Sequence, residues 1–104
     1  WEKKRQLLLE HLLLDLLMIL NMWRTNPQNT ESLMEDYMSN AKVIVEELAR
    51  MMRSQGLEDK AREWEEMKKR IEEIRQIIQN NSSKERAKEE LNRLITYVQS
   101  EIFR

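Results

Sequence analysis

The segment from Leu7 to Trp23, LLLEHLLLDLLMILNMW, constrains the fold most, because its only residues that are not apolar are Glu10, His11, Asp15 and Asn21. At about 100° per residue these polar residues share one side of a helix. That side also carries an apolar ridge of Leu7, Leu14, Met18 and Met22. Such a helix is apolar nearly all round, so either the rest of the chain packs on several of its sides or a patch is left for a second subunit.

The residues of this segment disfavour two other interpretations, a membrane-spanning helix and a secretory signal. In a membrane span, each of its three ionisable groups would cost roughly 2.5 to 3.5 kcal/mol if charged at the bilayer centre. A secretory signal is suggested by Lys3, Lys4 and Arg5 ahead of the run. However, an uncharged apolar region followed by a small-residue cleavage site is missing. The sequence therefore predicts a core helix of a soluble protein.

Residues that interrupt helices are scarce and gathered at three places. The chain has one glycine and one proline in 104 residues, against ordinary usage of about 7% and 5%. Turn-forming residues gather at Thr25–Thr30, around Gly56 and at Asn80–Ser83. These breaks predict a single domain, 1–104, with four helices at about residues 2–24, 28–55, 58–79 and 83–103.

The turns also carry capping signals. Pro27 disfavours helical geometry at Asn26 and suits a first helical turn, so the second helix is expected to start between 27 and 31, with Asn26 or Thr30 as N-cap. Gly56 is expected to adopt a positive φ at the C′ position of that helix, with apolar Leu57 following. Ser82 and Glu85, three residues apart, predict a capping box.

Apolar residues recur at three and four spacing in every predicted helix. The stripe covers about 160° of the helix at 28–55 and is narrower at 58–79, while the first helix, apolar on nearly every side, is expected to be the most enclosed. The residues at the centres of the stripes, and hence in the predicted shared core, are Leu16, Ile44, Leu48, Ile71, Ile74, Leu94 and Val98.

The expected fold is an all-α, up-down-up-down four-helix bundle, because the connections are too short to cross the length of the bundle. A stack of helical hairpins with the first helix central is the alternative. We expect the apolar ridge to be wrapped within one chain, giving a monomer. A homodimer through Leu7, Leu14, Met18 and Met22 is the other way to cover it.

Charge and cysteine content limit the classes of partner. Eighteen Lys and Arg balance nineteen Asp and Glu, so there is no net field for nucleic acid or an anionic membrane. With no cysteine there is neither a disulfide nor a thiolate metal site. The cell compartment stays undetermined, and no targeting signal is recognised.

His11 and Asp15 are the main candidates for chemistry, because at i and i+4 a carboxylate can orient an imidazole or share a metal. Zinc needs three or four ligands, and no supporting ligand spacing is present. Haem held by His11 and a core methionine is a further alternative. We expect a solvated polar face instead, and hence no metal, no cofactor, no catalytic residue and no enzymatic activity.

The three tryptophans could form a ligand pocket or a binding hot spot. Trp23 and Trp64 are more simply explained as caps on the ends of the core whose ring nitrogens reach water. Trp1 is expected to lie at a frayed terminus.

Residues near Gly56 resemble one tetratricopeptide helical hairpin: Val45, Leu48 and Ala49, then Gln55-Gly56, then Ala61. The likeness covers about 25 residues and does not recur at the period of about 34 residues that the family shows. A lone histidine on a bundle also resembles a histidine phosphotransfer domain, although Leu14-Asp15 stands where that family has a lysine-glycine pair.

Taken whole, the chain resembles a computationally designed helical protein, with Leu/Ile/Met cores, Glu/Lys/Arg surfaces and explicit caps. Its irregular loops and seven methionines suggest assembly from natural helix-turn-helix fragments. This resemblance implies a structural scaffold with no natural biochemical function. The alternative is a helical interaction module that binds a partner helix or itself through the first helix.

Overall fold

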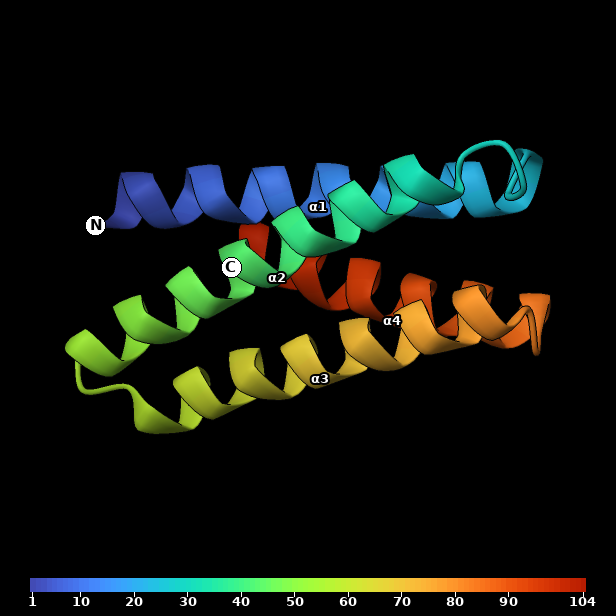
Figure 1. Ribbon diagram of the computed structural model, residues 1–104. Coiled ribbons are helices and arrows are strands. Elements are labelled where there is room, and N and C mark those ends of the chain that lie inside the picture. Colours follow the sequence, from blue (N-terminus) through green and yellow to red (C-terminus); the bar gives the residue numbers. More distant parts are fainter.

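Four helices make up the computed structural model, which describes residues 1–104 (Figure 1). They are α1 (Glu2–Thr25), α2 (Glu31–Ser54), α3 (Glu58–Asn80) and α4 (Lys84–Ile102). Each helix packs against the next in sequence, and α4 packs back against α1, whereas the backbones of the diagonal pairs, α1 with α3 and α2 with α4, do not approach each other closely. The predicted up-down-up-down bundle is confirmed, and the stack with a central first helix is excluded.

All four helices contribute to one core of 27 buried apolar residues. Six of the seven predicted core residues are buried in it, with Leu16, Leu48 and Val98 fully inaccessible. Ile44 is the exception: it is only partly buried and packs against the cluster from outside. It lies at the rim of the apolar arc of α2, where it lines a surface groove between α1 and α2.

Gly56 terminates α2 as the sequence predicts: it lies at the C′ position, two residues after the last helical residue, Ser54. Gly56 has φ +76°, its N–H donates to the Arg53 carbonyl (3.1 Å), and the Leu57 N–H donates to the Met52 carbonyl (2.9 Å). These two bonds form a Schellman motif, which satisfies carbonyls that the last helical turn would leave free.

The turn between α3 and α4 repeats this motif with asparagine in place of glycine. Asn81 has φ 50°, its N–H donates to the Ile78 carbonyl, and the Ser82 N–H donates to the Ile77 carbonyl. The N-cap of α4 is Ser83, whose hydroxyl accepts from the Arg86 N–H at 3.2 Å. The predicted capping box at Ser82 and Glu85 is therefore wrong by one residue, because the left-handed turn at Asn81 uses Ser82 to close α3.

α2 begins at Glu31, at the last position of the predicted range of 27 to 31 and three residues after the approximate bound of 28. Residues 27–29 form a separate turn, and Thr30 is the N-cap, one of the two expected positions. Its side chain does not cap the helix. The Thr30 hydroxyl donates backwards to the Asn26 carbonyl at 2.7 Å, which holds the turn together instead.

The prediction that α1 is the most enclosed helix is wrong. α1 and α2 bury equal numbers of residues. Within the predicted ridge only Met22 is buried, Met18 is partly exposed, and Leu7 and Leu14 are 52% and 55% exposed. A corner helix of a square bundle has two neighbours, so its outer side is left uncovered by the chain. α1 is also the one helix long and apolar enough to cross a membrane by length and composition, and 44% of that window is buried in the bundle.

Candidate functional site

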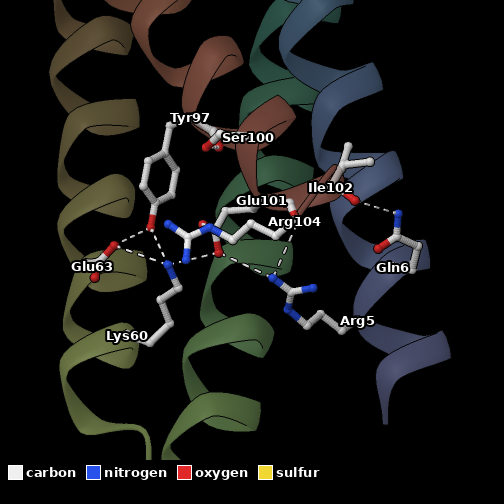
Figure 2. A network of polar contacts seen from close by, with 9 residues as sticks. All are labelled: Arg5, Gln6, Lys60, Glu63, Tyr97, Ser100, Glu101, Ile102 and Arg104. Carbon is white, nitrogen blue, oxygen red and sulfur yellow. Dashed lines mark hydrogen bonds and ion pairs between the residues drawn. The ribbon is translucent and has the colours of Figure 1, made fainter.

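The most polar cluster inside the protein surrounds Glu101, near the C-terminal end of α4 (Figure 2). Its side chain is completely buried, and its Oε1 lies 2.9 Å from the Lys60 Nζ and 3.3 Å from the Arg5 Nη2. The Arg104 Nε lies 3.0 Å from Oε2 as an ion pair. Burial of one carboxylate is thus compensated by cations from α1, α3 and the end of the chain.

The same cluster caps α4. The Arg5 guanidinium also donates to the Glu101 carbonyl, and the Gln6 amide donates to the Ile102 carbonyl at 3.3 Å. The last carbonyls of a helix have no partner within it and carry partial negative charge, so a neighbouring guanidinium and amide stabilise them. Side chains of α1 therefore finish a helix that the C-terminal sequence leaves without a glycine cap.

Tyr97 extends the cluster along α4. Its hydroxyl donates to a Glu63 carboxylate oxygen, and Lys60 lies within hydrogen-bond distance of the same hydroxyl. This hydrogen bond lowers the pKa of Glu63. Burial, followed by the bond to Glu63, raises the pKa of Tyr97 far above its ordinary value. Tyr97 is thus held as a neutral donor and Glu63 as a charged acceptor.

Glu101 was not among the predicted site residues, although the sequence contains a signal for it. Leu91, Leu94 and Val98 are buried on the inner face of α4, and Glu101 continues their three and four spacing. A charged residue in a core position needs partners from other helices. Arg5, in the charged start of α1, and Lys60, in the first turn of α3, reach that position only because the two helices begin at the same end of the bundle.

His11 and Asp15 do not form a joint site. His11 is exposed, whereas Asp15 is buried, so the expected solvated polar face is wrong for Asp15. Burial raises the pKa of Asp15, and the nearby His11 partly opposes this shift. The two side chains form no ion pair with each other, and no cluster of three or more His, Cys, Asp or Glu in the structure could hold a metal ion.

The tryptophans differ from their predicted roles. Trp23 is buried, and its ring N–H donates to the Lys84 carbonyl at 3.1 Å, so it does not reach water. Trp64 is fully buried, with its ring N–H unpartnered, and packs edge-on against Tyr97 at 5.4 Å between centroids. Contrary to the prediction, the ring nitrogens thus do not reach water: that of Trp23 binds a backbone carbonyl, and that of Trp64 is buried without a partner. Trp1 is half exposed, and its carbonyl accepts the first helical bond of α1, from the Arg5 N–H.

Exposed apolar side chains gather on the outer sides of α1 and α2, which we name the α1–α2 outer face. Its members are one row from each helix, with Val43 beside the row of α2: Leu7, His11, Leu14, Met18 and Asn21, and Leu33, Tyr37, Asn40, Val43, Ile44 and Glu47. None of these residues is buried. Between the rows lies a groove of about 400 Å³, lined by His11, Leu14 and Asp15 from α1 and Asn40, Val43 and Ile44 from α2.

A scan against protein-family models and a search of curated proteins each found no match to this chain.

Proposed function

We propose that this chain is a designed structural scaffold, assembled from natural helix-turn-helix fragments, with no natural biochemical function. The observation that carries the proposal is the single core of 27 residues, to which the apolar stripes of all four helices contribute. The helix caps, the apolar pattern and the packing all specify the same fold. A sequence that is chosen for its fold requires this consistency.

The polar interior supports the same proposal. Glu101 binds Arg5 and Lys60, and the Trp23 N–H binds a backbone carbonyl of α4. These contacts join helices, and they occupy the Glu101 Oε1 and the Trp23 N–H with groups of the chain itself.

The test is a ligand screen read out by thermal unfolding. A ligand that binds only the native state at a concentration of about 100 times its Kd adds about 2.7 kcal/mol of stability, which raises Tm by about 10 to 20 °C in a domain of this size. We expect zinc and haem to leave Tm unchanged. We also expect His11→Gln to leave fold and oligomeric state as they are. A rise in Tm with either ligand that His11→Gln abolishes would contradict the scaffold proposal.

The second candidate function, a helical interaction module, is favoured by one observation. Leu7 and Leu14 on α1 and Val43 on α2 are each more than half exposed on adjacent helices. Contiguous exposed apolar surface of this kind marks interaction sites in soluble proteins. A concentration-dependent dimer, or binding of an apolar dye by the monomer, supports this candidate if Leu14→Glu abolishes it. A monomer at every concentration that binds no dye contradicts it.

A further inference from the structure

The two rows of the α1–α2 outer face have the spacing of a coiled-coil seam. In α1 they are residues 7, 11, 14, 18 and 21, and in α2 residues 33, 37, 40, 44 and 47. Both alternate steps of four and three, the period at which helices pack by knobs into holes. α1 and α2 thus each carry two stripes. One stripe fills the core of the protein, and the other faces solvent.

The open rows lie side by side at matching levels. At one end the Lys4 ammonium of α1 binds the Glu47 carboxylate of α2 at 3.1 Å. In the middle, Leu14 lines the same groove as Val43 and Ile44. Two antiparallel helices with adjacent open seams are half of a four-helix bundle, so the face has the form of an unfinished bundle.

We propose that the α1–α2 outer face binds the same face of a second copy of this chain. In this dimer, α1 of each copy packs against α2 of the other, which completes a four-helix bundle. The second candidate function is the premise of this proposal, which names the partner. The two-fold axis runs parallel to the helices, between α1 and α2. Because such an axis preserves level along the helices, Leu14 lies against Val43 of the second copy, and Val43 lies against Leu14 of that copy.

The size of the face favours a second copy over a single partner helix. The molecule measures 41 × 21 × 20 Å, so one long face approaches the roughly 800 Å² per partner of a standard stable interface. A lone helix, about 10 to 12 Å across with its side chains, covers only about half of that width. A two-helix face is needed to cover it all, and this chain presents one.

The distribution of polar groups also fits an interface. Lys4, Glu47 and Arg50 stand at one end, joined by ion pairs, while Leu14, Val43 and Ile44 occupy the centre. An apolar centre with a charged rim is the usual anatomy of a protein interface. His11 and Asn40 are polar positions inside the two rows, whose last positions, Asn21 and Glu47, are polar as well. A polar residue inside a seam is a device that fixes register in coiled coils.

Sedimentation equilibrium from micromolar to millimolar protein tests the proposal. We expect a concentration-dependent mass that rises toward twice 12.7 kDa. Leu14→Glu and Val43→Lys should each raise the dimer Kd by about 100-fold, since each places a charge against an apolar partner at the centre of the interface. Both side chains are more than half exposed within one chain, so circular dichroism melts should show the fold retained. Phe103→Glu, at an 83% exposed residue outside the face, is the matched control and should dimerise normally.

Mixing the two variants tests the arrangement itself. In the crossed dimer, the carboxylate introduced at 14 in one chain meets the ammonium introduced at 43 in the other. The remaining contact, Leu14 with Val43, is unchanged. Equimolar Leu14→Glu and Val43→Lys should therefore form a heterodimer although each alone is a monomer. Variants that stay monomeric on mixing overturn this arrangement, because α1 packed on α1 leaves the new charges apart.

Three outcomes overturn the second copy as occupant. One is a monomer at every concentration that binds an apolar dye at the face, which leaves the interaction module standing with another partner. Another is a monomer that binds vesicles of anionic phospholipid and loses this binding in Leu14→Glu. The last is a monomer that binds neither dye nor vesicles, which removes the interaction module as well.

Discussion

At the scale of single residues, Glu101 combines the deepest burial with the most charged partners. Glu101→Ala should lower the free energy of unfolding by about 3 to 5 kcal/mol, because Arg5 and Lys60, both largely buried, would lose the carboxylate that compensates them. Urea melts at neutral pH measure this change. Arg104→Ala is the control: its guanidinium is 67% exposed, so the loss should stay within about 1 kcal/mol. Equal losses in the two variants would contradict this view of the network.

Leu48 tests the packing of the core. Its side chain is fully buried in α2, so Leu48→Ala should cost about 2 to 5 kcal/mol through lost contacts and a residual cavity. Leu17→Ala makes the same chemical change at a 41% exposed site on α1 and should cost much less. Guanidinium melts compare the two variants. A cost below about 1 kcal/mol for Leu48→Ala would mean that the assigned register of α2 is wrong.

At the scale of elements, the two left-handed turns allow a direct comparison. Gly56→Ala should destabilise by about 1 kcal/mol or more, although no atom lies near the added Cβ, because φ +76° carries the left-handed penalty for a residue with a side chain. Asn81→Gly should be neutral or stabilising, since glycine adopts the 50° φ of Asn81 more readily. Thermal melts of both variants measure the difference. A stable Gly56→Ala variant together with a destabilised Asn81→Gly variant would contradict the capping argument.

The polar contacts of Glu72 between α2 and α3 are predicted to lose their contribution to stability in acid. Hydrogen bonds from Lys42, Gln76 and Arg75 lower the pKa of Glu72 from its ordinary value of 4.5 to about 2. A folded-state pKa below the unfolded one contributes stability above pH 4.5, and this contribution is lost as the pH falls toward 2. Glu72→Gln should therefore be less stable than the unmodified chain at pH 7, and the gap should close near pH 2.

The closing gap is measured by urea melts across that pH range. The side chain of Glu72 is 40% exposed, so solvent screening keeps the gap small. Glu73→Gln is the matched control, because Glu73 is an exposed neighbour on α3 without an ion pair and should show no such closing gap. A Glu72→Gln gap that is constant with pH would contradict the prediction.

Helix positions were predictable where one local signal decided them, and less so where signals competed. Gly56, the sole glycine, marked the end of α2 correctly. At Asn80–Ser83, several adjacent residues suit either a cap or a left-handed turn, so the choice of Ser83 over Ser82 depended on how α3 ends. At Pro27 the proline suited a first helical turn, yet the chain formed a separate turn first.

At the scale of the whole molecule, the architecture was predictable because short connections between long helices leave few arrangements. The candidate sites were not, since they depend on which helix ends meet. Glu101 gains Arg5 only because α4 ends beside the start of α1. The burial of Leu7 and Leu14 likewise depends on how many helices pack against α1. The apolar pattern of α1 does not specify that number.

The hydrogen bond from the Gln6 amide to the Ile102 carbonyl joins the start of α1 to the end of α4. Residues 1 and 104 therefore lie at the same end of the bundle. The four helices follow one another around the bundle in chain order, and α4 and α1 are the only neighbours that no loop connects. A short flexible linker from Arg104 to Trp1 would connect these two helices, and a new opening within residues 27–29 would break no helix. Such a circular permutant would preserve every helix–helix interface while converting the contact most distant in sequence into a local one, so the identity of the first helix is incidental to the fold.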